Sequence, residues 1–398
     1  MTTLAPLSYS PYDYSIHEDP YPTYARLRAE APVFYNEELD FYALSRHADI
    51  LAAFRDIEHY SNANGVTLDP AAYGPDAHRA MSFLAMDPPR HTRMRSIVGK
   101  SFTPRRVAEM EDHIRRLALD HLTPALEAGT FDFVGDFAGR LPMDVISELV
   151  GVPPSDRVEV RRLADQLMHR DDGMSDIPRE GVEAALHLAG YYSEMVADRR
   201  LHERDDLTWS LLQTEIDGDR LTDDEVISFL FLLVVAGNET TTKLLSNAWY
   251  WGWRYPDQVA KPLTEPARVP DWVEETLRYD TSTQTILRVT RAPVTVCGVD
   301  IAEGERVLLL IGSANRDGEV FPDPDTYDLD RNTQDLISFG GGRHFCMGAA
   351  LARLEARVAL TEMCTRVSAY DVDPAGMVRV HSSNVRGLSA LPTTVTRR

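Results

Sequence analysis

The sequence predicts a mainly α-helical protein with minor β sheets. Most of residues 1–280 follow apolar patterns of helical period, separated by short breaks. The longest pattern begins at Thr222, spans over thirty residues and is apolar nearly all round in its first half, which is typical of a helix inside a large core. After about residue 288, β-branched runs bounded by turn residues predict short strands. Because we find no internal repeat or linker, we expect a single domain over residues 1–398.

The elements can be assigned in chain order. Residues 61–85 are rich in Gly, Pro, Asn and Asp, which predicts a long loop, either functional or disordered. The proline-rich stretch 256–271 leaves the local helix in doubt. Helical patterns cover residues 20–32, 42–56 after a short strand, 91–102, 104–129, 141–152, 179–203 and 348–367. We therefore expect a helix-rich core at about 80–280 and 340–370, with β-rich portions near the N-terminus, at 288–312 and near the C-terminus.

Bulk composition narrows the possible partners and compartment. The chain has 43% hydrophobic residues and a net charge of −21, which argues against nucleic acid as the main partner. Its three cysteines form no disulfide framework, so we expect a reducing, cytoplasmic location. The N-terminus resembles neither a signal peptide nor a membrane anchor. The longest apolar run, Phe229 to Gly237, is about half of what a bilayer span needs, so we expect no membrane anchor.

The long helix carries an unusual polar segment. Thr222 and Glu225 form a capping box at its start, and the pattern stops before Pro256. Within the apolar part lie Glu239 and Thr240, although burying an unpaired carboxylate costs several kcal/mol. One interpretation is a distorted turn with room for a small ligand and a proton-delivery pair. The alternative is that Gly237 serves helix packing and that Glu239 reaches a salt-bridge partner.

Cys346 lies between a glycine cluster and the predicted helix 348–367. The positive end of a helix there would stabilise a thiolate, and three glycines would let the backbone pass close to a flat, bulky ligand. A phosphate loop would need Gly-Lys-Ser/Thr, and zinc would need more ligands than His344 and Cys346. A thiolate ligand of iron and an inert buried thiol remain as interpretations.

Two further pairs have helical spacing. Glu275 and Arg278 are three residues apart and can form an ion pair, as surface residues often do. His91 and Arg95 are four residues apart and place two cationic groups on one helix face. Together with residues such as Arg288 and His344 they could hold the carboxylates of a bound group, or they could form an ordinary solvated basic face.

Taken together and in this order, these features make the chain resemble a bacterial cytochrome P450, a soluble haem-thiolate monooxygenase. The resemblance covers essentially the whole length and implies the triangular-prism fold and the cofactor of that family, haem b (iron protoporphyrin IX). Phe339 to Gly348 fit F-G-x-G-x-H-x-C-x-G at every fixed position, and Ala236 to Thr241 fit the oxygen-activation motif. Glu275 and Arg278 fit E-x-x-R. Arg331 fits the basic residue that completes that triad, and His91 and Arg95 fit H-x-x-x-R.

The resemblance assigns roles residue by residue. Cys346 is implied as the axial ligand of the haem iron, with Phe339 packed near the thiolate. The implied proton-delivery pair is Glu239 and Thr240. Positions implied to contact the cofactor or its propionates are Ala236, His91, Arg95, Arg288, Phe339, Gly340, His344 and Gly348. Glu275, Arg278 and Arg331 are implied to form a structural network.

The resemblance also implies an apolar substrate pocket over the haem and an external source of electrons. The implied pocket residues are Met86, Leu232, Val235, Ala236, Thr283, Ile286 and Val385, with Asn384 nearby. The chain departs from common family patterns at Asn238 and Ser282, which stand where His and Pro are frequent. We expect a hydrophobic small-molecule substrate and O₂.

Electrons are implied to come from a ferredoxin or flavodoxin with its NAD(P)H reductase. A basic docking patch is predicted from Arg90, Arg93, Lys100, Arg105, Arg106, Arg343, Arg353 and Arg357, although these could also be ordinary solvated helix faces. Alternative functions are a peroxide-driven haem peroxygenase and a non-catalytic haem sensor or binding protein. Glu239 and Thr240 favour the monooxygenase, because peroxide-driven relatives often lack this pair.

Overall fold

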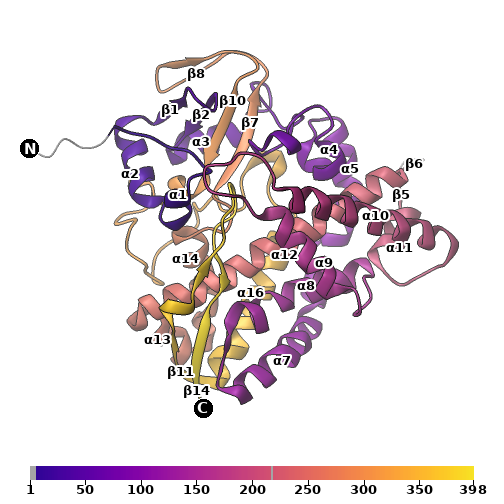
Figure 1. Cartoon of the computed structure of the whole chain (residues 1–398), viewed down its shortest axis with the longest axis vertical. Helices are drawn as coiled ribbons and strands as arrows, with labels where there is room; N and C mark the ends of the chain where they lie inside the picture. The colour runs from indigo at the N-terminus through magenta and orange to yellow at the C-terminus, as the bar shows by residue number, and fades with distance from the viewer. Residues whose placement is uncertain (1–5, 217) are drawn as a thin grey trace, which may run out of the picture.

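The computed structural model describes residues 6–216 and 218–398 and confirms the mainly α-helical fold class with small sheets (Figure 1). A five-stranded sheet and the N-terminal helices form one region, and most helices form the other. In Figure 1 the larger sheet lies at the top, whereas the C-terminal strands lie at the bottom. Two clusters of buried apolar side chains match these regions.

The larger sheet has the strand order β1-β2-β10-β7-β3. Strand β2 pairs antiparallel with β1 and parallel with β10, which in turn pairs antiparallel with β7. The elements of this region are α1 (Tyr14–Glu18), α2 (Tyr21–Glu30), β1 (Val33–Asn36), β2 (Phe41–Leu44), α3 (His47–Arg55), β3 (Tyr60–Ser61), β7 (Thr285–Thr290), β8 (Val294–Val296), β9 (Val299–Ile301), β10 (Arg306–Leu310) and α15 (Ile311–Ala314). The strand and helix expected within 42–56 are β2 and α3.

The helical region contains the predicted patterns as helices of similar extent. Its elements are α4 (His78–Met81), α5 (Arg90–Val98), α6 (Pro104–Glu109), α7 (Glu111–Ala128), α8 (Arg140–Val150), α9 (Arg157–Met168), α10 (Arg179–Leu201), α11 (Leu207–Gln213), α12 (Asp223–Arg254), α13 (Pro256–Thr264), α14 (Val269–Tyr279) and α16 (Ala349–Arg366). The doubt about 256–271 was wrong, because Pro256 stands at the first position of α13, where a missing N–H costs nothing. The loop 61–85 contains the short helix α4 and two 3₁₀ turns, at Pro70–Ala72 and Ser82–Ala85.

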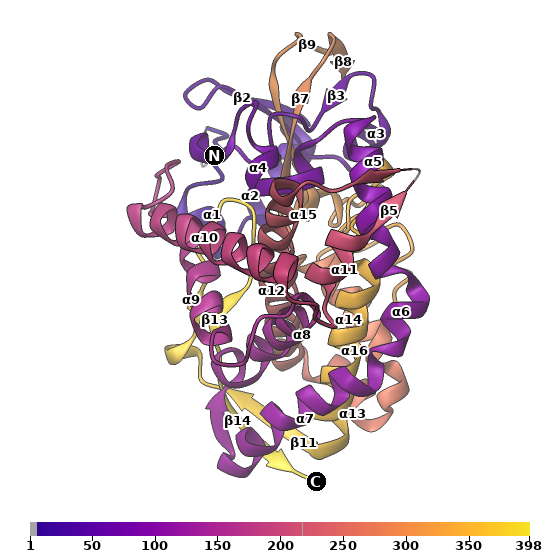
Figure 2. The same ribbon diagram turned by 90° about the vertical axis from the view of Figure 1, so that its right-hand side faces the viewer.

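Helix α12 lies at the centre of the helical region, as the sequence predicts (Figure 2). Its capping box is present: the Thr222 hydroxyl accepts from the Glu225 N–H, and the Glu225 carboxylate accepts from the Thr222 N–H. By length and composition this helix could cross a membrane, with mean hydropathy 1.2 in its most apolar window. It packs instead against α8, α10, α14 and α16 inside the fold, so it forms the central core helix.

Helix α16 connects the cysteine segment to the C-terminal strands. It packs against α7, α12 and α14 and leads directly into β11 (Val367–Val372). That strand pairs with β14 (Pro392–Arg397), which also pairs with β4 (Thr130–Asp132). The remaining short strands are β5 (Glu215–Ile216), β6 (Asp219–Arg220), β12 (Val378–Arg379) and β13 (Leu388–Ala390).

Candidate active site

Cys346 lies three residues before α16, at the N-terminal end of that helix. Its N–H donates to the Phe339 carbonyl over 2.9 Å, and the backbone N–H groups of Gly348 and Ala349 lie close to its sulfur. Burial raises the pKa of the thiol, while these N–H groups and the nearby Arg95 oppose that rise. Cys346 as a whole residue is nevertheless exposed. This combination suits a thiolate that binds a cation within the fold.

The glycines before Cys346 pack against α3, which gives a reason for their small size in addition to the room for a flat ligand that the sequence suggests. A Cβ on Gly342 would lie 2.3 Å from the Phe54 carbonyl oxygen, and one on Gly341 would lie 3.3 Å from the Phe54 Cβ. Gly340 and Gly342 also have positive φ angles of 70° and 63°. These glycines therefore set the loop path against α3, because any side chain there would be strained. Gly348 is different, since its nearest neighbour would be the Cys346 sulfur at 3.9 Å.

Two arginines and two histidines from three separate segments come together near Cys346. His91 and Arg95 lie on α5, Arg288 on β7, and His344 in the cysteine loop. The rings of His91 and His344 have centroids 4.0 Å apart, and both Arg95 and Arg288 act electrostatically on His344. Arg95 donates to the Phe345 carbonyl over 2.6 Å, which ties α5 to the cysteine loop. The structure thus brings together the four residues that the sequence suggested as carboxylate ligands.

This cluster lacks the anions that buried cations normally have. Arg288 is 3% exposed, and within the described residues it forms no ion pair; its Nη1 donates to the Leu287 carbonyl over 2.8 Å. Burial lowers the pKa of Arg288 to about 10 and that of His91 to about 4. Within the same part of the chain, neither ring nitrogen of His91 has a hydrogen-bond partner. A group with carboxylates, such as a haem with its propionates, fits these donors.

One face of α12 keeps accessible surface although the helix is central. Leu232, Ala236 and Thr240 are spaced four residues apart, so they share that face, while neighbours such as Val234 and Thr241 are buried. Thr240 Oγ1 donates back to the Ala236 carbonyl over 2.8 Å. The helix continues without a break from Asp223 to Arg254, so the expected distortion does not interrupt it.

Glu239 is buried and has a salt-bridge partner, as the alternative interpretation of this segment proposed. Its Oε2 lies 3.1 Å from Nζ of Lys243, and both side chains are 4% exposed. Asn238 Nδ2 donates to Glu239 Oε1 over 3.3 Å. Burial favours the neutral acid, but Lys243, Asp165 and Arg161 together outweigh it, so the pKa of Glu239 is lowered. The carboxylate is therefore ionised and lies one residue before Thr240.

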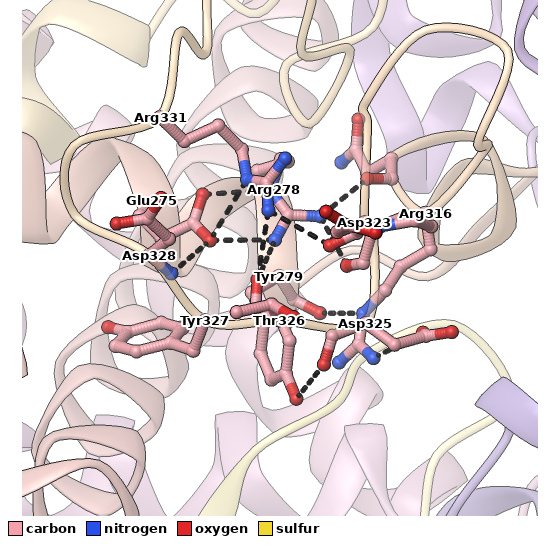
Figure 3. A network of polar contacts seen from close by, with 12 residues as sticks. Glu275, Arg278, Tyr279, Arg316, Asp323, Asp325, Thr326, Tyr327, Asp328 and Arg331 are labelled. Atoms are coloured by element: carbon pink, nitrogen blue, oxygen red, sulfur yellow. Dashed lines mark hydrogen bonds and ion pairs between the residues drawn. The ribbon is translucent and has the colours of Figure 1, made fainter.

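Glu275, Arg278 and Arg331 form a buried network rather than a surface pair (Figure 3). Arg278 donates from Nε and Nη2 to the two Glu275 oxygens, each over 2.7 Å. Arg331 Nε lies 3.5 Å from Glu275 Oε1, and the Asp328 N–H donates to the same oxygen over 2.9 Å. Arg278 also donates to carbonyls of the loop after α15, at Asn315, Pro324 and Thr326. The network thus fixes the long segment that precedes the cysteine loop.

The expected pocket residues come from the segments that surround this site. Thr283 and Val385 form a β-bridge, and the Gln284 N–H donates to the Asn384 carbonyl over 2.8 Å. The Met86 backbone lies beside the His344 ring. Leu232, Val235, Thr283 and Ile286 are half-buried, whereas Met86 and Val385 are buried. The chain departs from common family patterns at Asn238 and Ser282, and both of these residues are buried.

The predicted basic patch is partly neutralised. Four of its members form ion pairs: Arg93 with Asp219 and Glu225, Arg105 with Glu109, Arg353 with Glu274, and Arg357 with Glu111. The other four, Arg90, Lys100, Arg106 and Arg343, are exposed, and in residues 6–216 and 218–398 they form no ion pair. Arg353 also lies over the Phe339 ring, 4.4 Å from its centroid.

Sequence reasoning missed three charged residues around α12. Lys243 could have been found from its spacing of four residues after Glu239, which is the spacing of a helical ion pair. Asp165 on α9 lies within hydrogen-bond distance of Glu239, and Glu355 on α16 lies next to Thr241. No local pattern marks these two acids, because their partners are distant in the chain.

In the described chain, Cys346 at a helix N-terminus lies near the buried Arg288, which has no ion-pair partner, and near two histidines without a carboxylate partner. Together with the acid and threonine of α12, this arrangement fits the haem-thiolate class of proteins. The profile of the cytochrome P450 family matches residues 184–380. A putative cytochrome P450 123 of Mycobacterium tuberculosis is 54% identical, with 98% of this chain and 97% of the relative covered. The chain belongs to the cytochrome P450 family.

Other relatives are more distant but cover nearly the whole chain. A vitamin D(3) 25-hydroxylase of Pseudonocardia autotrophica is 36% identical, with 99% of this chain and 98% of the relative covered. The solved structure of cytochrome P450 CYP109Q5 from Chondromyces apiculatus matches with a TM-score of 0.88 at 34% identity, covering 98% of both chains. Like its family, this protein is a haem-thiolate monooxygenase that binds iron protoporphyrin IX.

Proposed function

We propose that this monooxygenase inserts one oxygen atom of O₂ into a hydrophobic small organic substrate, by hydroxylation or epoxidation, with electrons from a separate redox partner. The accessible face of α12 that carries Leu232, Ala236 and Thr240 supports this proposal most directly. It presents apolar surface for a substrate and a hydroxyl for proton delivery on the same side of one helix.

Cys346 would ligate the haem iron, and His91, Arg95, Arg288 and His344 would hold the propionates. Bound haem supplies the oxidation chemistry, and thiolate ligation favours O–O cleavage. Phe339 would shield the thiolate, because its ring is held under the Arg353 guanidinium. Ala236 would contact the distal side of the cofactor, while Gly340 and Gly348 would contact it near the thiolate.

Thr240 and Glu239 would deliver the protons that oxygen activation consumes. The Thr240 hydroxyl donates to the Ala236 carbonyl, so its oxygen lone pairs can accept a hydrogen bond from water or from an acid. Glu239, kept ionised by Lys243, can accept a proton and pass it on through water. Glu275, Arg278 and Arg331 would act structurally, by fixing the path to Cys346.

The substrate would lie among Met86, Leu232, Val235, Ala236, Thr283, Ile286 and Val385, most of which are apolar. Steroid, terpene, fatty-acid, polyketide and aromatic compounds all suit such a lining. The relative from Pseudonocardia autotrophica is named for hydroxylation of vitamin D(3), which makes that secosteroid a sensible first compound to test.

Electrons would come from a ferredoxin or flavodoxin with its NAD(P)H reductase, in the cytoplasm. The exposed cations Arg90, Lys100, Arg106 and Arg343 support docking of an acidic partner, since they form no ion pair in the described chain. Charge reversal of Lys100 and Arg106 to Glu should lower the rate of first-electron transfer, and the effect should shrink at high salt.

A screen for compounds that shift the ferric enzyme from low to high spin would identify the substrate. With that compound and a ferredoxin system, Thr240→Ala should lower product formed per O₂ consumed by about tenfold, whereas Thr242→Ala, a control buried on another face, should not. Turnover that is faster with peroxide alone would favour the peroxygenase. Binding without any oxidised product, and no effect of Thr240→Ala, would favour the sensor.

A further inference from the structure

A second carboxyl group lies against the buried acid of α12. Asp165 is in the third turn of α9. Helix α9 packs against both α10 and α12, and all three helices are labelled in Figure 2. The carboxyl groups of Asp165 and Glu239 lie within hydrogen-bond distance of each other. Two carboxylates cannot both be ionised at that distance without strong repulsion, so one of them has to hold a proton.

The surrounding charges decide which carboxyl group holds the proton. Lys243 lies 3.1 Å from Glu239, whereas the cation nearest to Asp165 is Arg161, at 3.9 Å. Glu239 therefore has the better-placed counter-ion and is the ionised member. Asp165 is left to donate its O–H to Glu239, and the partial burial of its carboxyl group together with the Glu239 charge raises the pKa of Asp165 to about 8.

Other titratable groups on the elements packed against α9 face elsewhere. On α10, His187 lowers the pKa of Glu159 electrostatically, and Glu159 stands at the start of α9. From α8, Asp144 and Glu148 are held by Arg157, also at that end. From α12, Glu239 and Lys243 face Asp165. The local electrostatics of Asp165 are thus set by those two groups and by Arg161 of its own helix.

The two carboxyl groups differ sharply in their access to water. The Asp165 side chain is 48% exposed, whereas that of Glu239 is 4% exposed. A proton that leaves Glu239 cannot be replaced directly from solvent, because the carboxylate is buried. Asp165 touches both solvent and Glu239, so it connects the two.

We infer that Asp165 passes protons from solvent to the Glu239 carboxylate during turnover. The inference rests on the proposed role of Glu239 and Thr240 in proton delivery. In each cycle the Asp165 O–H bond breaks as an O–H bond forms on Glu239, and water then returns a proton to the Asp165 carboxylate. No electrons move in this step. Asp165 is a positioning residue, since it acts through Glu239 and not on substrate.

Infrared titration of the ferric holoenzyme tests the proton on Asp165 without turnover. The difference spectrum of wild type minus Asp165→Asn should contain a protonated carboxyl band at pH 7, which disappears with a midpoint near pH 8. Taking this difference removes the band of Glu355, whose pKa burial also raises to about 8. In Glu239→Gln the midpoint should fall, because the neighbouring anion is gone. Glu159→Gln, on the same helix but away from Glu239, should leave the band unchanged.

Coupling of O₂ consumption to product tests the role of that proton. In wild type, coupling should decline above about pH 8. In Asp165→Asn it should be lower at pH 7, by less than the roughly tenfold loss expected for Thr240→Ala, and independent of pH, because Asp165 acts through Glu239. A difference spectrum without the band, or Asp165→Asn with the coupling and pH profile of wild type, would overturn the inference. If Glu239→Gln and Thr240→Ala leave coupling unchanged, the proposed proton-delivery role fails instead, whatever the band shows.

Discussion

The buried pair Glu275–Arg278 allows a stability prediction with a magnitude. Glu275 accepts two hydrogen bonds of 2.7 Å from Arg278 and one of 2.9 Å from the Asp328 N–H. Replacing Glu275 by Gln keeps the shape but removes the charge and turns an N–H₂ group toward one of these donors. The guanidinium of Arg278, which is 0% exposed, then lacks a counter-ion. Breaking a buried pair in this way costs about 3–5 kcal/mol.

Urea unfolding followed by far-UV circular dichroism would measure this loss in the holoenzyme. The matched control is Arg26→Ala, which removes a surface pair with Glu30 of similar helical spacing and should cost far less, because water screens an exposed pair. If Glu275→Gln does not accumulate as folded protein, Arg331→Ala provides a milder test, since it removes the 3.5 Å contact with Glu275. A loss from Glu275→Gln no larger than that of the control would refute the reasoning.

Three other changes separate the roles of single residues. Arg288→Leu should raise the stability of the apoprotein, because it removes a buried unpaired cation, and should weaken haem retention about tenfold or more, as measured by haem transfer to an acceptor globin. Gly342→Ala should destabilise by at least about 2 kcal/mol in urea unfolding, whereas Gly298→Ala, which has positive φ but open space, should cost less. Burial raises the pKa of Glu355 to about 8, so the folded protein holds that proton and loses stability as pH rises from the usual range of Glu toward 8. Glu355→Gln should flatten that decline in unfolding experiments at pH 5 to 8, and an unchanged slope would contradict the assignment.

Local signals in the sequence predicted the helices and the site loop well. The capping box at Thr222 and the apolar period located α12, and the glycine-flanked Cys346 located the start of α16. These features depend on residues within a few positions of one another, so a sequence pattern can carry them. The helix in the proline-rich stretch before α14 was harder to predict, because a proline such as Pro256 can mark either a helix break or the first position of a helix.

Contacts between distant segments could not be read from the sequence. The Phe54 carbonyl leaves no room for a side chain at Gly342, although Phe54 lies almost three hundred residues earlier in the chain. Glu274 neutralises Arg353 across α14 and α16, which removes a charge from the predicted patch. The approach of Asp165 to Glu239 likewise depends on how α9 crosses α12. Tertiary packing decides each of these pairs, and local spacing does not encode it.

The identity of the axial ligand is the central claim, and the spectrum of the reduced carbonyl complex tests it most directly. Thiolate ligation by Cys346 predicts a red-shifted Soret band in wild type. Cys364→Ser should keep this band, because Cys364 is buried within α16, farther along the helix. Cys346→Ser should lose it while the fold remains, as judged by far-UV circular dichroism. A red-shifted band that persists in Cys346→Ser would contradict the account.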